Sequence, residues 1–229
     1  MVRARHTHPA RGIPNGLSRG YPADVTHELR DHWDRAYALG DHTRSWFQEE
    51  AAPSVASFDA AGVTPADSVI DIGCGASRLV DALLDLGFDD LTVLDVSPAA
   101  IQIARTRAGL RAAQVTWVVT DLLDWAPPRR YAVWHDRAVL HFLVTDEDQR
   151  RYAAALDRAT EPGSVAVIAG FAPDGPTQCS GLPTARHDEV SLAALVGPSW
   201  ELVSSRLEVH RTPNDAEQSF LWTTFRRIG

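Results

Sequence analysis

Apolar residues recur along this chain with two different periods, and the periods alternate from residue 66 onward. Short runs rich in β-branched residues predict strands, and the stretches between them repeat apolar residues at helical spacing. The predicted strands are residues 68–72, 91–95, 115–120, 131–134 and 165–171. The predicted helices are residues 78–86, 98–107 and 146–159, with a further helical region from Ala138. This alternation is typical of βαβ units, whose parallel sheet is covered by helices on both faces.

The carboxyl-terminal residues follow a different pattern. Residues 201–210 and 218–227 are two strand-like runs separated only by residues 211–217. A connection of that length joins antiparallel strands and cannot hold a crossover helix. We therefore predict an α/β fold with a doubly wound, mostly parallel, seven-stranded sheet and an antiparallel hairpin at its carboxyl-terminal edge.

The residues ahead of the first strand divide into two parts. Residues 1–24 mix Arg, His, Gly and Pro without apolar periodicity, which predicts a flexible basic arm. Residues 25–62 repeat apolar residues at helical spacing and predict a helical cap. The length from residue 25 to residue 229 suits one domain of about 200 residues.

Composition excludes several kinds of chemistry. The chain has no lysine, so all 22 of its basic residues are arginine. This excludes Schiff-base catalysis by lysine and the lysine-containing phosphate loop. Residues 1–24 hold four Arg and one Asp, a charge of +3, which leaves −11 for the rest of a chain whose formal charge is −8. An acidic body repels a phosphate backbone, so we expect no nucleic-acid partner.

Cysteine use and hydropathy indicate the compartment. The two cysteines, Cys74 and Cys179, form no disulfide framework and have no zinc spacing, which favours a reducing environment. No apolar run approaches the roughly 18 residues that a membrane helix needs. The first residues lack the apolar core of a secretory signal. We therefore expect a cytoplasmic protein with no membrane contact, and the sequence leaves its oligomeric state open.

A glycine-containing turn follows the first strand. Asp71 is followed by Gly73-Cys74-Gly75 and then by the next helix. Glycine lets the backbone come close to a ligand beyond the carboxyl ends of the strands. Asp95 ends the second strand, where a carboxylate can bridge two ribose hydroxyls, and Asp121 ends the third, where it could accept a hydrogen bond from an exocyclic amine.

This set of residues resembles the motifs of class I S-adenosylmethionine-dependent methyltransferases. The resemblance spans residues 31–227 and implies a Rossmann-like methyltransferase fold. It is strongest to small bacterial members with an HWD…Y…SWF amino-terminal segment, here residues 32–34, 37 and 45–47. It implies S-adenosyl-L-methionine as cofactor, with the glycine turn at the methionyl part, Asp95 at the ribose and Asp121 at the adenine. The expected cofactor-binding residues are Tyr37, Trp46, Asp71, Gly73, Cys74, Gly75, Arg78, Asp95, Val96, Asp121 and Leu122.

A nicotinamide dinucleotide site is the main alternative for the same turn. Its fingerprint needs a third glycine where this chain has Arg78. Asp71 also directs negative charge toward the place where a pyrophosphate would lie, whereas it suits a cationic sulfonium with an ammonium group. An NAD-dependent oxidoreductase and a non-catalytic cofactor-binding module remain second alternatives.

The acceptor is expected past the fourth strand. His135 or His141 could act as a base, Asp136 could orient a histidine or an amine, and Arg137 could bind an anionic substrate. Alternatively, Asp136 and Arg137 only cap and pair at the start of the next helix. The two histidines and Asp136 lack a recognised ligand spacing, so we expect no metal site.

The resemblance implies transfer of a methyl group to O, N or S of a small molecule. The residues after the fourth strand do not match the [DN]-PP-[YFW] motif of adenine amino-methyltransferases. A protein lysine methyltransferase remains the first alternative, because Asp136 could match the acid of a D-x-G-like motif.

The resemblance also divides the domain. Residues 25–62 form the cap, residues 66–171 the cofactor-binding core, residues 172–186 a substrate-side loop, and residues 187–229 a helix with the edge hairpin. Within the last two segments, Cys179 and His210 are expected to contact substrate.

Overall fold

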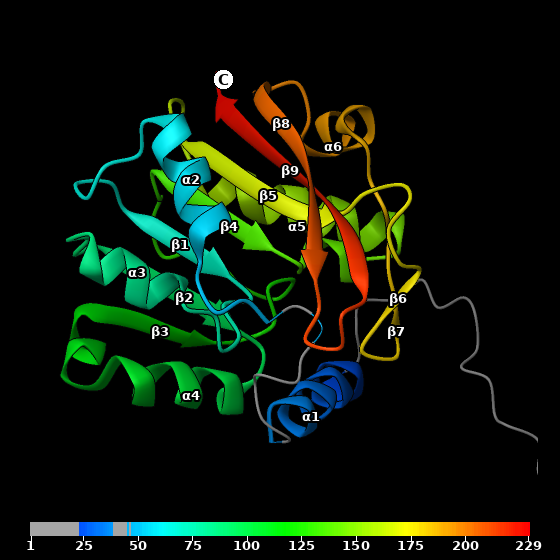
Figure 1. Ribbon diagram of the computed structural model, residues 1–229. Coiled ribbons are helices and arrows are strands. Elements are labelled where there is room, and N and C mark those ends of the chain that lie inside the picture. The colour runs from blue at the N-terminus through cyan, green and yellow to red at the C-terminus, as the bar shows by residue number, and fades with distance from the viewer. Residues whose placement is uncertain (1–22, 39–44, 46) are drawn as a thin grey trace, which may run out of the picture.

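The computed structural model describes residues 23–38, 45 and 47–229, and its centre is a seven-stranded sheet in the order β3-β2-β1-β4-β5-β9-β8 (Figure 1). The five strands β1 to β5 run parallel to one another, and β9 is antiparallel to both β5 and β8. The fold is therefore the predicted Rossmann-like methyltransferase fold. The strands of this sheet are β1 Val69–Ile72, β2 Leu91–Asp95, β3 Val115–Val119, β4 Val133–Arg137, β5 Val165–Phe171, β8 Trp200–Arg211 and β9 Glu217–Arg227.

Helices cover both faces of the sheet. One apolar core lies between the sheet and α2, α3 and α4, and a second lies between the opposite face and α5 and α6. Figure 1 shows α2 and α3 in front of the strands and α5 behind them. The helices are α1 Ala23–Ala38, α2 Ala52–Ala61, α3 Leu79–Asp85, α4 Pro98–Ala108, α5 Asp146–Ala159 and α6 Glu189–Val196. The short elements are the 3-10 turns η1 Gly109–Gln114 and η2 Leu140–Phe142 and the strands β6 Gln178–Cys179 and β7 Leu182–Pro183.

Alternation along each strand decides which core a side chain enters. In β4, Val133 packs into the core beneath α2 and α3, whereas Trp134 packs into the core beneath α5. Successive side chains of a strand point to opposite faces. His135 and Asp136 therefore leave the same strand on opposite sides of the sheet.

Two predicted boundaries around β4 are wrong. The strand was expected to end at Trp134, but it continues to Arg137, because the hydrogen bonds of His135 and Asp136 allow both polar residues to be buried. The helical region expected from Ala138 is only the turn η2. Ala138 has φ 72°, in the left-handed region, which ends the strand and prevents a helix from starting there.

Hydrogen bonds at helix starts explain several boundaries. Ser97 caps α4, Thr145 caps α5, and Asp188 forms a capping box with Ser191 at α6. α1 begins at Ala23, and the predicted arm before it lies almost wholly outside the described residues.

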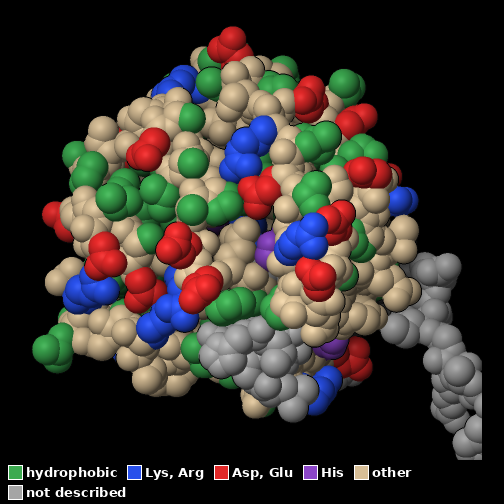
Figure 2. Space-filling model, in the orientation of Figure 1, with side chains coloured by type: hydrophobic (Ala, Val, Ile, Leu, Met, Phe, Trp, Pro, Cys, Tyr) green, Lys and Arg blue, Asp and Glu red, His purple; other side chains and the backbone are tan. Residues whose placement is uncertain are grey.

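Charge is mixed on the face seen in Figure 2, where arginine and acidic side chains alternate over the described part of the surface. Several arginines of the described chain belong to ion pairs, including Arg107 with Asp81 and Arg206 with Glu208. None of the helices in the described part of the chain has the length and apolar character needed to cross a membrane.

Candidate functional site

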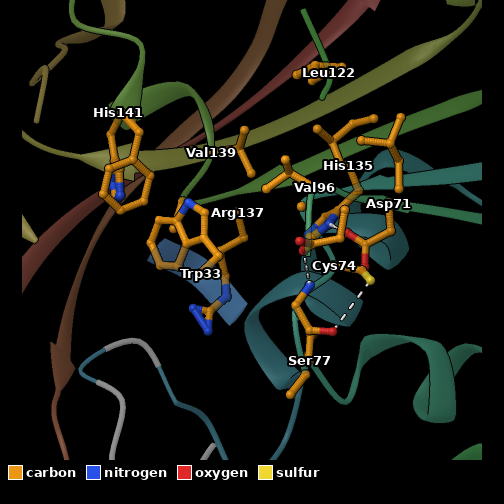
Figure 3. A pocket seen from close by; sticks show the side chains of 18 of the residues that line it. Trp33, Asp71, Cys74, Ser77, Val96, Leu122, His135, Arg137, Val139 and His141 are labelled. Atoms are coloured by element: carbon orange, nitrogen blue, oxygen red, sulfur yellow. Dashed lines mark hydrogen bonds and ion pairs between the residues drawn. The ribbon is translucent and has the colours of Figure 1, made fainter. Parts of the chain in front are cut away.

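A cavity of about 160 Å³ opens where β1, β2, β3 and β4 end (Figure 3). Its wall runs without interruption from the turn after β1 to the turn η2. α1 and residues 47–51 close the side opposite the strands. Every described residue expected to bind the cofactor lines it. These are Tyr37, Asp71, Gly73, Cys74, Gly75, Arg78, Asp95, Val96, Asp121 and Leu122.

The turn after β1 needs glycine at two positions. Gly73 has φ 61° and Gly75 has φ 53°, and both values lie in the region that other residues avoid. A Cβ on Gly73 would lie 2.0 Å from Val139 Cγ2, and one on Gly75 would lie 2.2 Å from Tyr37 Oη. The backbone of the turn is therefore packed directly against the side chain of Val139, which precedes η2, and against that of Tyr37 on α1.

Asp95 is fixed by the backbone on both sides. Its Oδ2 accepts a hydrogen bond from Gly75 N at 2.7 Å, and its Oδ1 accepts one from Ser97 N at 2.8 Å. Burial raises the pKa of Asp95 to about 6, although these two N–H donors act to lower it. Each carboxylate oxygen keeps a second lone pair that a ribose hydroxyl can use.

Asp121 lies on the same rim after β3. Its Oδ1 accepts a hydrogen bond from Leu123 N at 2.9 Å, and burial raises its pKa. Val96 and Leu122 are apolar members of the same wall, as Figure 3 shows. A carboxylate between apolar residues can hold the amine edge of a flat adenine ring.

Asp71 belongs to a buried chain of hydrogen bonds. Its Oδ1 lies 2.7 Å from His135 Nδ1, and His135 Nε2 lies 3.0 Å from Ser54 Oγ on α2. The other oxygen, Asp71 Oδ2, is buried and has no hydrogen-bond partner among the described residues. Phe58, one turn further along α2, packs edge-on against the His135 ring with centroids 5.6 Å apart.

α1 is attached to both ends of the cavity. Asp34 accepts hydrogen bonds from Ser97 Oγ at 2.5 Å and Ala99 N at 3.2 Å, so it adds a second cap to α4. The preceding residue, Trp33, packs against Phe142 of η2 with ring centroids 5.1 Å apart. Aromatic residues of the predicted helical cap therefore contribute to the cavity wall, with Tyr37 and Phe47 also in it.

His141 dominates the far end of the cavity. Its ring stacks on Phe171 with centroids 4.3 Å apart and packs edge-on against Phe142. Only 1% of the residue is exposed, and neither ring nitrogen has a partner among the described residues. Burial, with the nearby charge of Arg137, lowers the pKa of His141 to about 3, so its ring is neutral at neutral pH.

Two further predicted substrate residues line this end. Arg137 comes from the end of β4, and burial lowers its pKa while Glu208 and Asp71 act in the opposite direction. Cys179, on β6, lies with its Sγ 3.7 Å from Ser45 Oγ. Burial raises the pKa of Cys179, so its thiol is not activated as a nucleophile.

Comparisons with known proteins agree with this geometry. Residues 69–163 match the family model of a methyltransferase domain. The chain is 28% identical over 109 residues to the eEF1A lysine and N-terminal methyltransferase of Mus musculus, which covers 47% of this chain and 16% of that protein. It is 27% identical over 152 residues to EEF1A lysine methyltransferase 2 of Mus musculus, or 58% of this chain and 61% of that protein. The chain thus spans less than two thirds of either relative.

Solved structures give the same picture over nearly the whole chain. A structure concerned with conversion of a disulfide bond into a thioacetal group during echinomycin biosynthesis is 25% identical, with a TM-score of 0.68, covering 87% of this chain and 93% of that one. The Burkholderia thailandensis 1,6-didemethyltoxoflavin-N1-methyltransferase is 22% identical, with a TM-score of 0.70 and 94% of each chain covered. The chain therefore has the fold of class I, S-adenosylmethionine-dependent methyltransferases, and residues 69–163 carry the match to a methyltransferase domain.

The chemistry of the cavity fits S-adenosylmethionine as cofactor. The buried, unpartnered oxygen of Asp71 suits an ammonium group, whereas it would repel a pyrophosphate. Asp95 and Asp121 present acceptor atoms further along the same wall. When bound, the cofactor supplies an electrophilic methyl group on a sulfonium sulfur.

Two residues that were expected at the site lie elsewhere. Asp136 is fully buried on the opposite side of the sheet, where it accepts hydrogen bonds from Val139 N at 2.9 Å and Leu140 N at 3.1 Å. Asp136 therefore caps the turn that follows β4, in agreement with the alternative that it only caps the next element. His210 donates from Nε2 to the Ser45 carbonyl at 2.7 Å and is not part of the cavity wall. Trp46, another expected residue, lies outside the described residues.

The sequence analysis gave no role to two residues that help to build the site. Ser54 was only part of the predicted helical cap, and Asp34 was only part of the HWD…Y…SWF segment. The polar position of Ser54 on a predicted apolar helix face was the one available signal. No group of three or more His, Cys, Asp or Glu suited to a metal occurs among the residues that the structure describes.

Proposed function

We propose that this methyltransferase moves a methyl group from S-adenosylmethionine to a nucleophilic O, N or S of a small molecule. The observation that carries the proposal is one continuous cavity, which joins the glycine turn to His141 beneath α1. A cofactor on the glycine turn and a small acceptor beside His141 would share one water-poor space. Shared enclosure of this kind favours an in-line transfer by positioning the two reactants.

The chain's own residues divide the work. Asp71, Asp95 and Asp121 would bind the ammonium, the ribose and the adenine amine. The unpartnered nitrogens of neutral His141 would accept the proton that an acceptor hydroxyl, thiol or ammonium releases. Arg137 would stabilise negative charge on the acceptor before the transfer. Ring packing of Trp33 against Phe142 would keep water away from the reacting atoms.

A protein lysine methyltransferase is the alternative, because both curated relatives named above are lysine methyltransferases. The position of Asp136 speaks against it. This residue was the candidate match to a D-x-G-like acid, and it caps η2 on the side of the sheet away from the cavity.

Two experiments test the proposal. Calorimetry with S-adenosylmethionine and with NAD should give binding of the former only, and tighter binding of NAD would refute the cofactor assignment. A screen with radioactive methyl donor over thiols, phenols, carboxylates and amines should then yield a methylated small molecule. Labelling of a protein in a cell lysate, with no small-molecule product, would favour the lysine alternative. Cofactor binding with no transfer to any class would favour a non-catalytic module.

Several parts of the sequence analysis stay predictions. They include the likeness of residues 32–47 to small bacterial methyltransferases, the division of residues 25–229 into segments and the roles of the individual site residues. The absence of a nucleic-acid partner and a location in the cytoplasm also stay predictions.

A further inference from the structure

The geometry points to Ser54 and His135 as positioning residues that hold Asp71 with one oxygen turned toward the amino group of the cofactor. This inference rests on the proposed function. It concerns residues outside the glycine turn itself, namely one from α2 and one from the middle of β4.

The first step is the pairing of the strands. Asp71 and His135 are direct neighbours in the parallel register of β1 and β4. Both side chains leave the same face of the sheet, and Figure 3 shows them pointing toward each other. The bond between His135 Nδ1 and Asp71 Oδ1 is therefore fixed by the sheet and does not depend on a flexible loop.

The second step is the direction of the hydrogen bonds. A carboxylate only accepts, so His135 Nδ1 carries the hydrogen that it donates to Asp71. In the neutral ring, Nε2 is then an acceptor and receives the Ser54 hydroxyl hydrogen. Ser54, Asp71 and the edge contact from Phe58 hold the ring from three directions.

The third step is what this arrangement leaves free. Oδ1 of Asp71 already accepts a hydrogen bond from the imidazole, so Oδ2, which has no partner among the described residues, is the oxygen more open to a ligand. Without His135 the carboxylate could turn toward Arg137, which is close enough to interact with it electrostatically. An Asp71–Arg137 pair would cancel the charge that attracts an ammonium group.

A serine, a histidine and a carboxylate in this order also resemble a hydrolytic triad. Here, however, the atom without a partner is at the carboxylate end of the chain, beside the glycine turn. Asp71 is therefore the residue that contacts the ligand, and Ser54 only holds His135 in place.

The test compares two ligands by calorimetry: S-adenosylhomocysteine, and a thioether analogue in which hydrogen replaces its amino group. Wild-type protein should bind the amino ligand about 10- to 100-fold more tightly, the range for a hydrogen bond to a charged group. His135→Leu should reduce this ratio to about threefold, mostly by weakening the amino ligand. His135→Asn, whose amide can still donate to Asp71, should keep most of the ratio.

Ser57→Ala is the matched control for Ser54→Ala. Both serines are buried on α2, but the Ser57 hydroxyl donates to the Pro53 carbonyl at 2.9 Å. Ser54→Ala should lower the ligand ratio severalfold, and Ser57→Ala should leave it unchanged. This pair decides the matter if thermal unfolding shows that His135→Leu does not fold.

Three results would overturn the inference. The first is an equal loss of both ligands in His135→Leu, which would indicate a purely structural role. The second is an unchanged ratio in both His135→Leu and Ser54→Ala. The third is covalent labelling of Ser54 by a phosphonate ester, which would identify a nucleophile. Failure of the wild-type protein to bind S-adenosylhomocysteine at all would instead refute the proposed function.

Discussion

The two ends of the cavity are built in different ways. At the cofactor end, Asp95 accepts hydrogen bonds from two backbone N–H groups, and the backbone of the glycine turn forms the wall. At the acceptor end, the wall consists of side chains from distant elements, and His141 is buried without a hydrogen-bond partner among the described residues. At the cofactor end the backbone therefore already holds Asp95, although Asp71 Oδ2 has no partner among the described residues, whereas at the acceptor end both ring nitrogens of His141 would have to be satisfied by a ligand.

This contrast teaches where stability and function conflict. A buried polar group without a partner costs folding free energy, commonly about 1–3 kcal/mol. Proteins commonly keep a buried polar group of this kind at a functional site, at a cost in stability, where their activity needs the group. The four predictions below test the contrast between the two ends.

The largest effect is expected at the acceptor end, from His141→Phe. The phenyl ring can keep the stacking on Phe171 but removes both unpartnered nitrogens. We expect kcat for a proton-releasing acceptor to fall about 10²- to 10⁴-fold. The affinity for S-adenosylhomocysteine should be unchanged, and the free energy of unfolding unchanged or higher by about 1 kcal/mol. Methyl-transfer kinetics and thermal unfolding measure these. Undiminished kcat would show that His141 is not the base.

The next effect is expected from Gly73→Ala at the cofactor end. Positive φ costs a residue with Cβ about 1–2 kcal/mol, and the contact with Val139 adds about 1–3 kcal/mol. Chemical denaturation should therefore show a loss of about 2–5 kcal/mol, with weaker cofactor binding. Gly87→Ala is the control, since Gly87 also has positive φ but nothing within 4 Å. Failure of Val139→Ala to restore part of the loss would contradict the proposed clash.

A smaller effect is expected from Asp95→Asn. The amide nitrogen would face an N–H donor from Gly75 or Ser97, and one ribose acceptor would be lost. We expect S-adenosylhomocysteine to bind about 10- to 100-fold more weakly, as for loss of a charged hydrogen bond. Asp136→Asn is the comparison, because Asp136 lies outside the cavity wall, and calorimetry should show nearly wild-type affinity. Equal losses in both variants would indicate a general effect on folding.

The smallest effect concerns pH. The pKa of Asp95 is raised to about 6, so its carboxylate is mostly ionised at pH 7 and mostly protonated at pH 5. The ionised form is the better acceptor for ribose, so affinity for S-adenosylhomocysteine should fall about tenfold as pH drops from 7 to 5. Asp121→Asn should retain most of this dependence, whereas Asp95→Asn should lose it. A flat profile in the wild-type protein would show that Asp95 stays ionised.

The cofactor end was predictable because its geometry belongs to the backbone. Gly73, Gly75 and Asp95 occupy fixed places relative to strand ends, and strand ends can be read from apolar periodicity. The sheet and its antiparallel edge followed from the same periodicity. Where β4 ends could not be predicted, because the burial of His135 and Asp136 depends on partners that are distant in sequence or contributed by the following turn.

For the acceptor end, the sequence predicted candidate residues but not which of them reach the cavity. Strand alternation places His135 and Asp136 on opposite sides of the sheet, but the register of β4 was unknown, so both were candidates. Ser54 on α2 and His141 on η2 reach the cavity because of how these elements pack against the sheet, and apolar periodicity does not predict that packing. His210 lies in a strand of the hairpin, and its hydrogen-bond partner, the carbonyl of Ser45, is far away in sequence.

The attachment of α1 has a consequence for the kinetics of turnover. One helix reaches Asp95's neighbour Ser97 through Asp34 and the acceptor end through Trp33. A movement of α1 that admits one reactant therefore loosens the wall around the other. We expect release of the methylated product and of the spent cofactor to share one opening step, so that substitutions in α1 alter both dissociation rates together.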